Sequence, residues 1–288
     1  MDQLRQIGNE KDIQGESPVW CAREQALYWV DTRSRLVRRL DHASGQINSW
    51  KLPELTCSIV IRDAGGLLVA MQNAIVLFDA RTGEVLERIN APHAPEAGMR
   101  FADGRCDRRG RFWVGAKHDA SSAPIGFLYR FDPDHSFTAM ETGVAMPNSL
   151  AWSPDNRSMY FADAAVRTIF TYSFDIEHGT IAARKPFAIC DWSPDGAAMD
   201  SEGYLWNAGY RGWRVTRYAP DGRVDREIKL PVSLVTACTF GGPNMQTLYI
   251  TTARQKMTEE ALAEQPLAGA LFAIDAGVRG LEEPRYAG

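Results

Sequence analysis

Four short segments of the chain each contain one side chain that could bind a metal ion or a substrate, close to glycine, proline or serine. They contain Glu16 (residues 15–20), Arg100 (99–104), Asn148 (146–150) and Asp195 (193–197). Oxygen atoms of Glu, Asn and Asp side chains are ligands that hard and borderline divalent cations take. Two carboxylates that face one another are costly to bury unless a positive charge lies between them. If the four segments meet in the fold, they predict a divalent metal site with an arginine beside it.

An internal repeat indicates how these segments are arranged. One short pattern recurs six times: a turn residue, then a bulky apolar residue, then an aromatic residue or leucine, then a small or apolar pair. Its copies begin at residues 27, 67, 112, 159, 205 and 248. The steps are 40, 45, 47, 46 and 43 residues. A period of roughly 20–50 residues is typical of solenoids and propellers. Each copy is short and bounded by turn residues, which favours a strand over a helix.

A second strand-like segment follows each copy, beginning at residues 36, 75, 127, 169, 215 and 270. Most of these segments run into a turn that contains glycine, as a tight hairpin requires. We therefore predict an all-β protein: a six-bladed β-propeller with four-stranded antiparallel blades around a central channel. Residues 1–288 are expected to form one domain, and the N-terminal strand, near Gln6 and Ile7, is expected to close the last blade.

These four candidate binding residues each precede a copy of the repeat by a similar distance along the sequence, about 8–14 residues. Similar positions in different blades lie at a similar height, so Glu16, Arg100, Asn148 and Asp195 should converge at one mouth of the channel. Structural interpretations stay open, because Asp195-Gly196 and Pro147-Asn148 are also typical turn pairs. The acidic residues that end the strand-like segments are expected to be structural: Asp31, Asp41, Asp79, Asp132, Asp163 and Asp275.

Composition excludes several classes of function. The net charge is −4 over 288 residues, so no basic face for a nucleic acid is expected. No apolar run approaches the roughly 18 residues of a membrane span, and residues 1–5 do not begin a signal peptide. The five cysteines are far apart and odd in number, so we expect reduced thiols and a cytoplasmic protein. A short helix is expected at residues 258–264.

Together the unrepeated segments resemble the regucalcin/gluconolactonase family. The resemblance is carried by Gly-Glu-Ser-Pro-Val-Trp (15–20), Arg-Phe-Ala-Asp-Gly (100–104), Met-Pro-Asn-Ser-Leu-Ala-Trp (146–152), Pro-Asp-Gly-Ala-Ala-Met-Asp (194–200) and Phe-Gly-Gly-Pro-Asn (240–244). It implies a propeller with one divalent metal ion, Ca²⁺, Zn²⁺, Mn²⁺, Mg²⁺ or Fe²⁺, held by Glu16, Asn148 and Asp195. It also implies that Arg100 binds substrate and that the reaction is hydrolysis of a sugar-acid lactone such as glucono-, xylono- or arabinonolactone.

Two positions depart from the pattern of that family. Ala102 stands where the family usually has an asparagine that contacts substrate, and Lys117 stands where it usually has methionine in Gly-Thr-Met. A neutral hydrogen-bonding group is therefore replaced by a cation near the same mouth. This exchange suggests an acidic lactone as substrate, bound by Arg100, Ala102, Asp103, Lys117 and His118.

The expected mechanism is metal-assisted attack of water on the lactone carbonyl. Asp195 is expected to act as the catalytic base, with Asp103 as an alternative proton acceptor. Two other interpretations remain: a propeller that binds calcium or another metal without turnover, and a propeller that serves as a protein-interaction platform.

Overall fold

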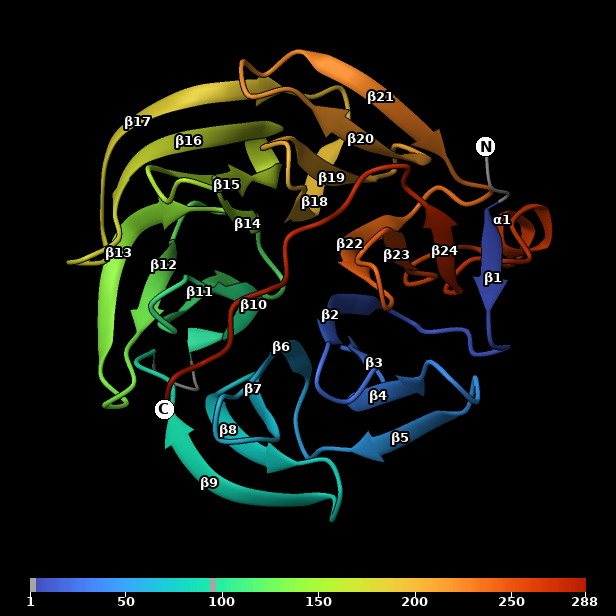
Figure 1. The fold of residues 1–288 in the computed structure, drawn as a ribbon, viewed down its shortest axis with the longest axis horizontal. Coiled ribbons are helices and arrows are strands. Elements are labelled where there is room, and N and C mark those ends of the chain that lie inside the picture. The colour runs from blue at the N-terminus through green and yellow to red at the C-terminus, as the bar shows by residue number, and fades with distance from the viewer. Residues whose placement is uncertain (1–3, 94–96) are drawn as a thin grey trace.

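The structure, a computed structural model, describes residues 4–93 and 97–288. Its regular structure consists almost entirely of antiparallel β-strands, which form six four-stranded sheets. The sheets are arranged as blades around a central axis (Figure 1). The prediction of an all-β, six-bladed propeller is therefore confirmed.

Five blades are built from four consecutive strands each. The first contains β2 (Gly15–Cys21), β3 (Ala26–Asp31), β4 (Leu36–Asp41) and β5 (Ile47–Lys51); the second contains β6 (Thr56–Ile61), β7 (Leu67–Met71), β8 (Ala74–Asp79) and β9 (Glu84–Asn90). The third contains β10 (Met99–Cys106), β11 (Phe112–His118), β12 (Gly126–Phe131) and β13 (Phe137–Val144); the fourth contains β14 (Pro147–Trp152), β15 (Ser158–Asp163), β16 (Thr168–Asp175) and β17 (Thr180–Ile189). The fifth contains β18 (Ser193–Met199), β19 (Leu205–Tyr210), β20 (Arg214–Tyr218) and β21 (Val224–Lys229).

The sixth blade joins the two ends of the described chain. It contains β22 (Val235–Gly241), β23 (Thr247–Thr252) and β24 (Leu271–Asp275), with β1 (Arg5–Ile7) as its outermost strand. In the ladder, Gln6 lies opposite Phe272. The short helix α1 (Glu259–Glu264) lies between β23 and β24, and the Thr258 hydroxyl caps it by accepting a hydrogen bond from the Ala261 N–H, as predicted.

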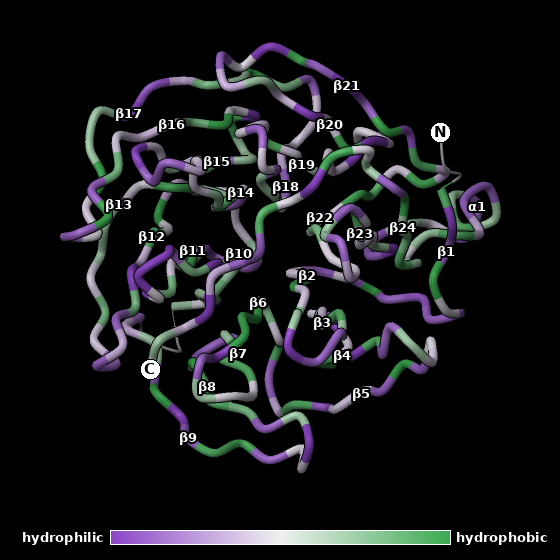
Figure 2. Tube along the Cα trace, in the orientation of Figure 1, coloured by the Kyte–Doolittle hydropathy of each residue, from purple (hydrophilic) through white to green (hydrophobic). Residues whose placement is uncertain are grey.

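The first strand of each blade lies nearest the axis, where neighbouring first strands contact one another (Figure 1). The six repeated sequence copies form the second strands, which are almost wholly buried because their apolar residues pack between blades. Outer strands such as β21 are largely exposed, and Figure 2 shows mostly hydrophilic residues there and hydrophobic residues along β6. The outer strands therefore face solvent at the rim of the ring.

The acidic residues at strand ends form turns, as expected from the sequence. Asp41 accepts a hydrogen bond from the Ser44 N–H (3.0 Å), and Asp79 accepts one from the Arg81 N–H (2.8 Å). Such side-chain contacts to a following backbone N–H stabilise tight turns.

The C-terminal segment, residues 276–288, crosses one end of the ring (Figure 1). Backbone hydrogen bonds join Leu281 to the fifth blade and Tyr286 to the second. Glu283 forms an ion pair of 3.1 Å with Arg105, near the end of β10, and Tyr286 is fully buried. The crossing segment covers the end of the channel opposite the start of the first strands.

The five cysteines, Cys21, Cys57, Cys106, Cys190 and Cys238, are free and buried. Within residues 4–93 and 97–288, no helix has the length and apolar character needed to cross a bilayer.

Candidate active site

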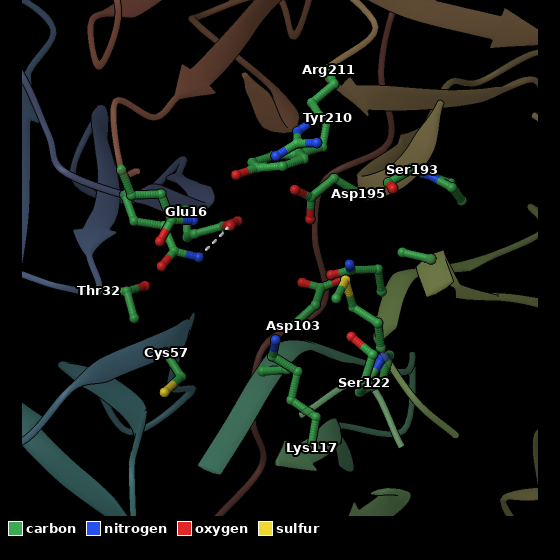
Figure 3. Close-up of a pocket in the computed structure, with 18 of the residues that line it drawn as sticks. Glu16, Thr32, Cys57, Asp103, Lys117, Ser122, Ser193, Asp195, Tyr210 and Arg211 are labelled. Atoms are coloured by element: carbon green, nitrogen blue, oxygen red, sulfur yellow. Dashed lines mark hydrogen bonds between the residues drawn. The ribbon is translucent and has the colours of Figure 1, made fainter. Parts of the chain in front are cut away.

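A cavity of about 490 Å³ opens at the end of the ring where the first strands begin (Figure 3). Residues from five of the six first strands, β2, β6, β10, β14 and β18, line it, together with loops that follow the second strands. The structure gathers seven of the eight predicted site residues there: Glu16, Arg100, Ala102, Asp103, Lys117, Asn148 and Asp195. The eighth, His118, does not line the cavity.

Irregular backbone aims these side chains toward the axis. Glu16 and Asn148 are the second residues of β2 and β14, and the ladder register breaks directly after each of them. The next residues, Ser17 and Ser149, adopt positive φ angles of 49° and 60°. A β-bulge bends a strand and redirects the neighbouring side chain, and bulges are common beside functional sites. A regular strand would continue straight past the mouth of the channel.

The bulge serines also connect neighbouring blades. The Ser149 hydroxyl donates to the backbone carbonyl of Asp195 (2.5 Å), and the Asn207 side-chain N–H groups donate to the same carbonyl and to Ser149 Oγ (both 2.8 Å). These buried hydrogen bonds fix the position of Asn148 in the fourth blade relative to Asp195 in the fifth. In the first blade, Ser17 Oγ accepts a hydrogen bond from the Ile59 N–H of the second (3.0 Å).

Two strand-end carboxylates hold the loops that lead into the site. Asp31 accepts hydrogen bonds from the backbone N–H groups of residues 13 and 14 (2.9 and 3.1 Å), just before Glu16. Asp163 accepts equivalent bonds from residues 145 and 146 (3.0 and 2.9 Å), just before Asn148. Both acidic residues are therefore structural, as expected, and they anchor the strands that carry the candidate ligands.

Three carboxyl groups share the cavity. Desolvation raises the pKa of Glu16, and repulsion from Asp103 raises it further. Desolvation and repulsion from Glu16 raise the pKa of Asp195 well above its usual range. Desolvation also raises the pKa of Asp103, although Asp103 accepts a hydrogen bond from the Leu150 N–H (3.3 Å). Without a cation, this group of acids is electrostatically unfavourable in its ionised form.

The Asn148 side chain contacts the fifth blade. With its amide N–H groups turned toward the neighbouring oxygen atoms, it donates to Asp195 Oδ1 (3.1 Å) and to the Pro147 carbonyl (3.0 Å). Its amide oxygen and the carboxylates of Glu16 and Asp195 are donor types that fit a divalent cation. In residues 4–93 and 97–288, no group of three or more His, Cys, Asp or Glu side chains could hold a metal ion.

Arg100 has less freedom than the sequence suggests. Its Nε forms an ion pair of 2.6 Å with Asp119, and its Nη1 donates to the Phe101 carbonyl (2.8 Å). Arg33 holds the same carboxylate through two hydrogen bonds of 2.9 Å each. Of the guanidinium nitrogens of Arg100, Nη2 alone makes no hydrogen bond to a described residue, and it remains for a ligand.

Lys117 and His118 lie on opposite faces of β11 because side chains alternate along a strand. Lys117 lines the cavity, with its backbone opposite Arg100 in the ladder. His118 instead packs against Gly98, and its Nδ1 accepts a hydrogen bond from the Ala120 N–H (3.2 Å). The alternation gives the reason why only Lys117 reaches the site.

Several lining residues were not identified from the sequence. Cys57 lines the cavity from the second position of β6, the position that Glu16 and Asn148 occupy in their strands. That shared position was a signal in the repeat. Arg33 and Tyr210 lie at the ends of second strands or in the loops after them, where the repeat carries no pattern.

The sequence matches the family model described as the SMP-30/Gluconolactonase/LRE-like region over residues 14–254. The chain is 38% identical to 6-deoxy-6-sulfogluconolactonase of Pseudomonas putida over 99% of each chain. It is 34% identical to L-arabinolactonase of Azospirillum brasilense, covering 98% of this chain and 95% of that protein. Among solved structures, the calcium-binding protein regucalcin of Agrobacterium tumefaciens superposes with a TM-score of 0.94 at 25% identity, over 99% of this chain and 97% of that chain.

Proposed function

The chain belongs to the SMP-30/Gluconolactonase/LRE-like family, and from this premise we propose that it is a sugar lactonase that uses one divalent cation. The observation that carries the proposal is the convergence of Glu16, Asn148 and Asp195 in one cavity, where Asp103 adds a third carboxyl group. The high pKa values of the two acids are consistent with a site that a cation stabilises.

In the proposed mechanism, Glu16, Asn148 and Asp195 hold the cation. When bound, a divalent cation supplies Lewis acidity for the lactone carbonyl and lowers the pKa of water near it. Asp195 accepts the proton of the attacking water, and Asp103 is the alternative acceptor in the same cavity. The water oxygen bonds to the carbonyl carbon, the ring C–O bond breaks, and the released ring oxygen takes up a proton.

Arg100 contributes one N–H group to this reaction. Its Nη2 can donate to a hydroxyl group or ring oxygen of the lactone, while Asp119 and the Phe101 carbonyl hold the rest of the guanidinium in place. A donor that is fixed before the substrate arrives needs no reorganisation during the reaction.

The names of the relatives indicate the class of substrate but not its charge. L-arabinolactonase and 6-deoxy-6-sulfogluconolactonase are named for a neutral lactone and for one with a sulfonate group, respectively. We therefore propose a sugar-acid lactone, and the names leave its charge open.

The proposal is tested by measuring acid release from a panel of sugar lactones with a pH indicator, with and without Mn²⁺, Zn²⁺ or Ca²⁺. The wild-type protein is expected to release acid only with a cation, and Asp195→Asn is expected to lose turnover. Asp191→Asn, an exposed aspartate at the rim of the same cavity, is the matched control and should keep activity. Metal binding without acid release from any lactone would contradict the lactonase and favour a metal-binding propeller.

A further inference from the structure

We infer that the cavity contains a second subsite, distinct from the metal ligands, that binds an anionic substituent of the substrate through Lys117. The inference rests on the proposed lactonase function and narrows its substrate class to sugar lactones that carry a carboxylate or sulfonate group. Arg100 and Arg33 supply the positive potential around this subsite.

The wall of the cavity near β11 has an excess of positive charge. Arg33, Arg100 and Lys117 all line it, and Asp119 is the carboxylate that the two arginines share. Asp119 is fully engaged by these two guanidinium groups, which hold its pKa below the usual range. Three cations against one carboxylate leave two positive charges uncompensated on this wall.

Lys117 is the member of this group whose charge is not engaged in an ion pair, whereas both arginines are paired with Asp119. Its Nζ makes no hydrogen bond or ion pair with any residue in the described ranges 4–93 and 97–288. In Figure 3 its side chain extends from β11 toward the interior of the cavity. The neighbouring Ala102 offers only a methyl group to the cavity. An incoming anion therefore meets an ammonium group that no hydrogen bond or ion pair already engages.

The acids of the cavity do not neutralise Lys117. Their attraction would raise the pKa of the lysine, yet desolvation and repulsion from Arg100 outweigh the attraction of Asp119 and Asp195 and lower it. An anion placed beside the ammonium group relieves this cost. Charge-assisted hydrogen bonds of this kind are about twice as strong as neutral ones.

The formal charge of the cavity lining favours a substrate with an anionic group. The lining contains six cationic and five anionic side chains: Arg33, Arg100, Lys117, Arg167, Arg211 and Lys256, and Glu16, Asp103, Asp119, Asp191 and Asp195. With a divalent cation bound, these charges sum to three positive charges.

The test compares two lactones of the same ring size. Glucaro-1,4-lactone has a free carboxylate, and glucono-1,4-lactone has a hydroxymethyl group at the same end. We expect wild type to have the higher kcat/KM for glucaro-1,4-lactone. Lys117→Met is expected to lower that value about tenfold or more and to change the value for glucono-1,4-lactone by about twofold at most. Lys256→Met, at another point of the same cavity, controls for net charge.

Three results would overturn the inference while leaving the lactonase intact: equal losses for both lactones in Lys117→Met, an equal effect of Lys256→Met, or a preference of wild type for the neutral lactone. If neither lactone is hydrolysed, the proposed function fails, and calorimetric titration with the open-chain acids still decides the subsite. Glucarate should then bind wild type more tightly than gluconate does, and the difference should vanish in Lys117→Met. Equal affinities would refute the subsite.

Discussion

At the scale of single residues, the protonation state of Lys117 controls the proposed anion subsite. Desolvation, with repulsion from Arg100, lowers the pKa of Lys117 to about 8. The ammonium form exists below this pKa and is lost as the pH rises through it, so binding of an anion should weaken in the same direction. Because kcat/KM reports groups of the free enzyme, it is the quantity that should show the titration.

A divalent cation in the same cavity repels the ammonium group of Lys117 and lowers this pKa further. We therefore predict that kcat/KM for an anionic lactone, relative to that for a neutral lactone of the same ring size, falls as the pH rises through a value at or below about 8. The measurement is a pH profile for both substrates, corrected for spontaneous hydrolysis in alkaline buffer. Lys117→Met should remove the difference between the two profiles. Parallel profiles in wild type would show that Lys117 does not contact the substrate.

Residues that keep a similar distance from a copy of the repeat could be placed from the sequence, and residues in loops without such a relation could not. Glu16, Asn148 and Asp195 lie at similar positions in different blades, and the sequence correctly brings them to one cavity. The pairing of Arg33 with Asp119 joins residues 86 positions apart through side chains in two loops. No periodicity relates those loops. For the same reason the sequence did not predict the ion pair between Arg100 and Asp119.

At the scale of secondary structure, the bulge at Ser149 determines how Asn148 and Asp195 face each other. Ser149→Ala keeps the backbone free to adopt the same φ but removes the hydroxyl that donates to the Asp195 carbonyl. We predict a loss of about 1 kcal/mol in the free energy of unfolding. We also predict roughly tenfold weaker metal binding, because the two candidate ligands become less well positioned.

Calorimetric metal titration and denaturant unfolding measure these two effects. Ser233→Ala, which removes a hydroxyl bonded to Gln265 in a loop outside the cavity, is the matched control. It should affect stability alone. Unchanged metal affinity in Ser149→Ala would mean that the bulge does not position the ligands.

The strands could be predicted from the sequence because their apolar residues and turns recur with the period of the blades. The bulges could not be predicted in this way. A bulge needs one residue with an unusual φ, and glycine is its common signal. Here serine adopts the positive φ at positions 17 and 149, stabilised by hydrogen bonds to the next blade. Those contacts exist only in the assembled ring.

At the scale of the whole molecule, β1 covers the open edge of β24 and so completes the sixth blade. Removal of residues 1–8 should lower the melting temperature by about 5 °C, since three ladder pairs are lost and an edge is exposed. Thermal unfolding followed by circular dichroism measures this change. Gln6→Ala, which keeps the backbone pairing, should leave the melting temperature nearly unchanged. A truncated protein that melts like wild type would contradict the role of β1.

The segment that covers the other end of the channel had no signal in the sequence. Residues 276–288 follow the last repeat and contain neither alternation nor a helical period. Their position depends on particular contacts, such as the ion pair between Glu283 and Arg105 and the burial of Tyr286. Such contacts become visible only when the ring has placed β10 and the second blade beside them.

One divalent cation in the cavity, on which lactone hydrolysis depends, would explain why Glu16, Asn148 and Asp195 meet there. This dependence is tested by titrating chelator-treated protein with Mn²⁺ while measuring the initial rate of gluconolactone hydrolysis and the amount of bound metal. We expect no enzymatic rate without metal and a rate that rises in proportion to bound Mn²⁺ up to one ion per chain. Glu16→Gln should bind Mn²⁺ weakly and stay inactive at that concentration. Full activity in metal-free protein, or a rate that does not follow metal occupancy, would show that hydrolysis does not depend on a cation in this cavity.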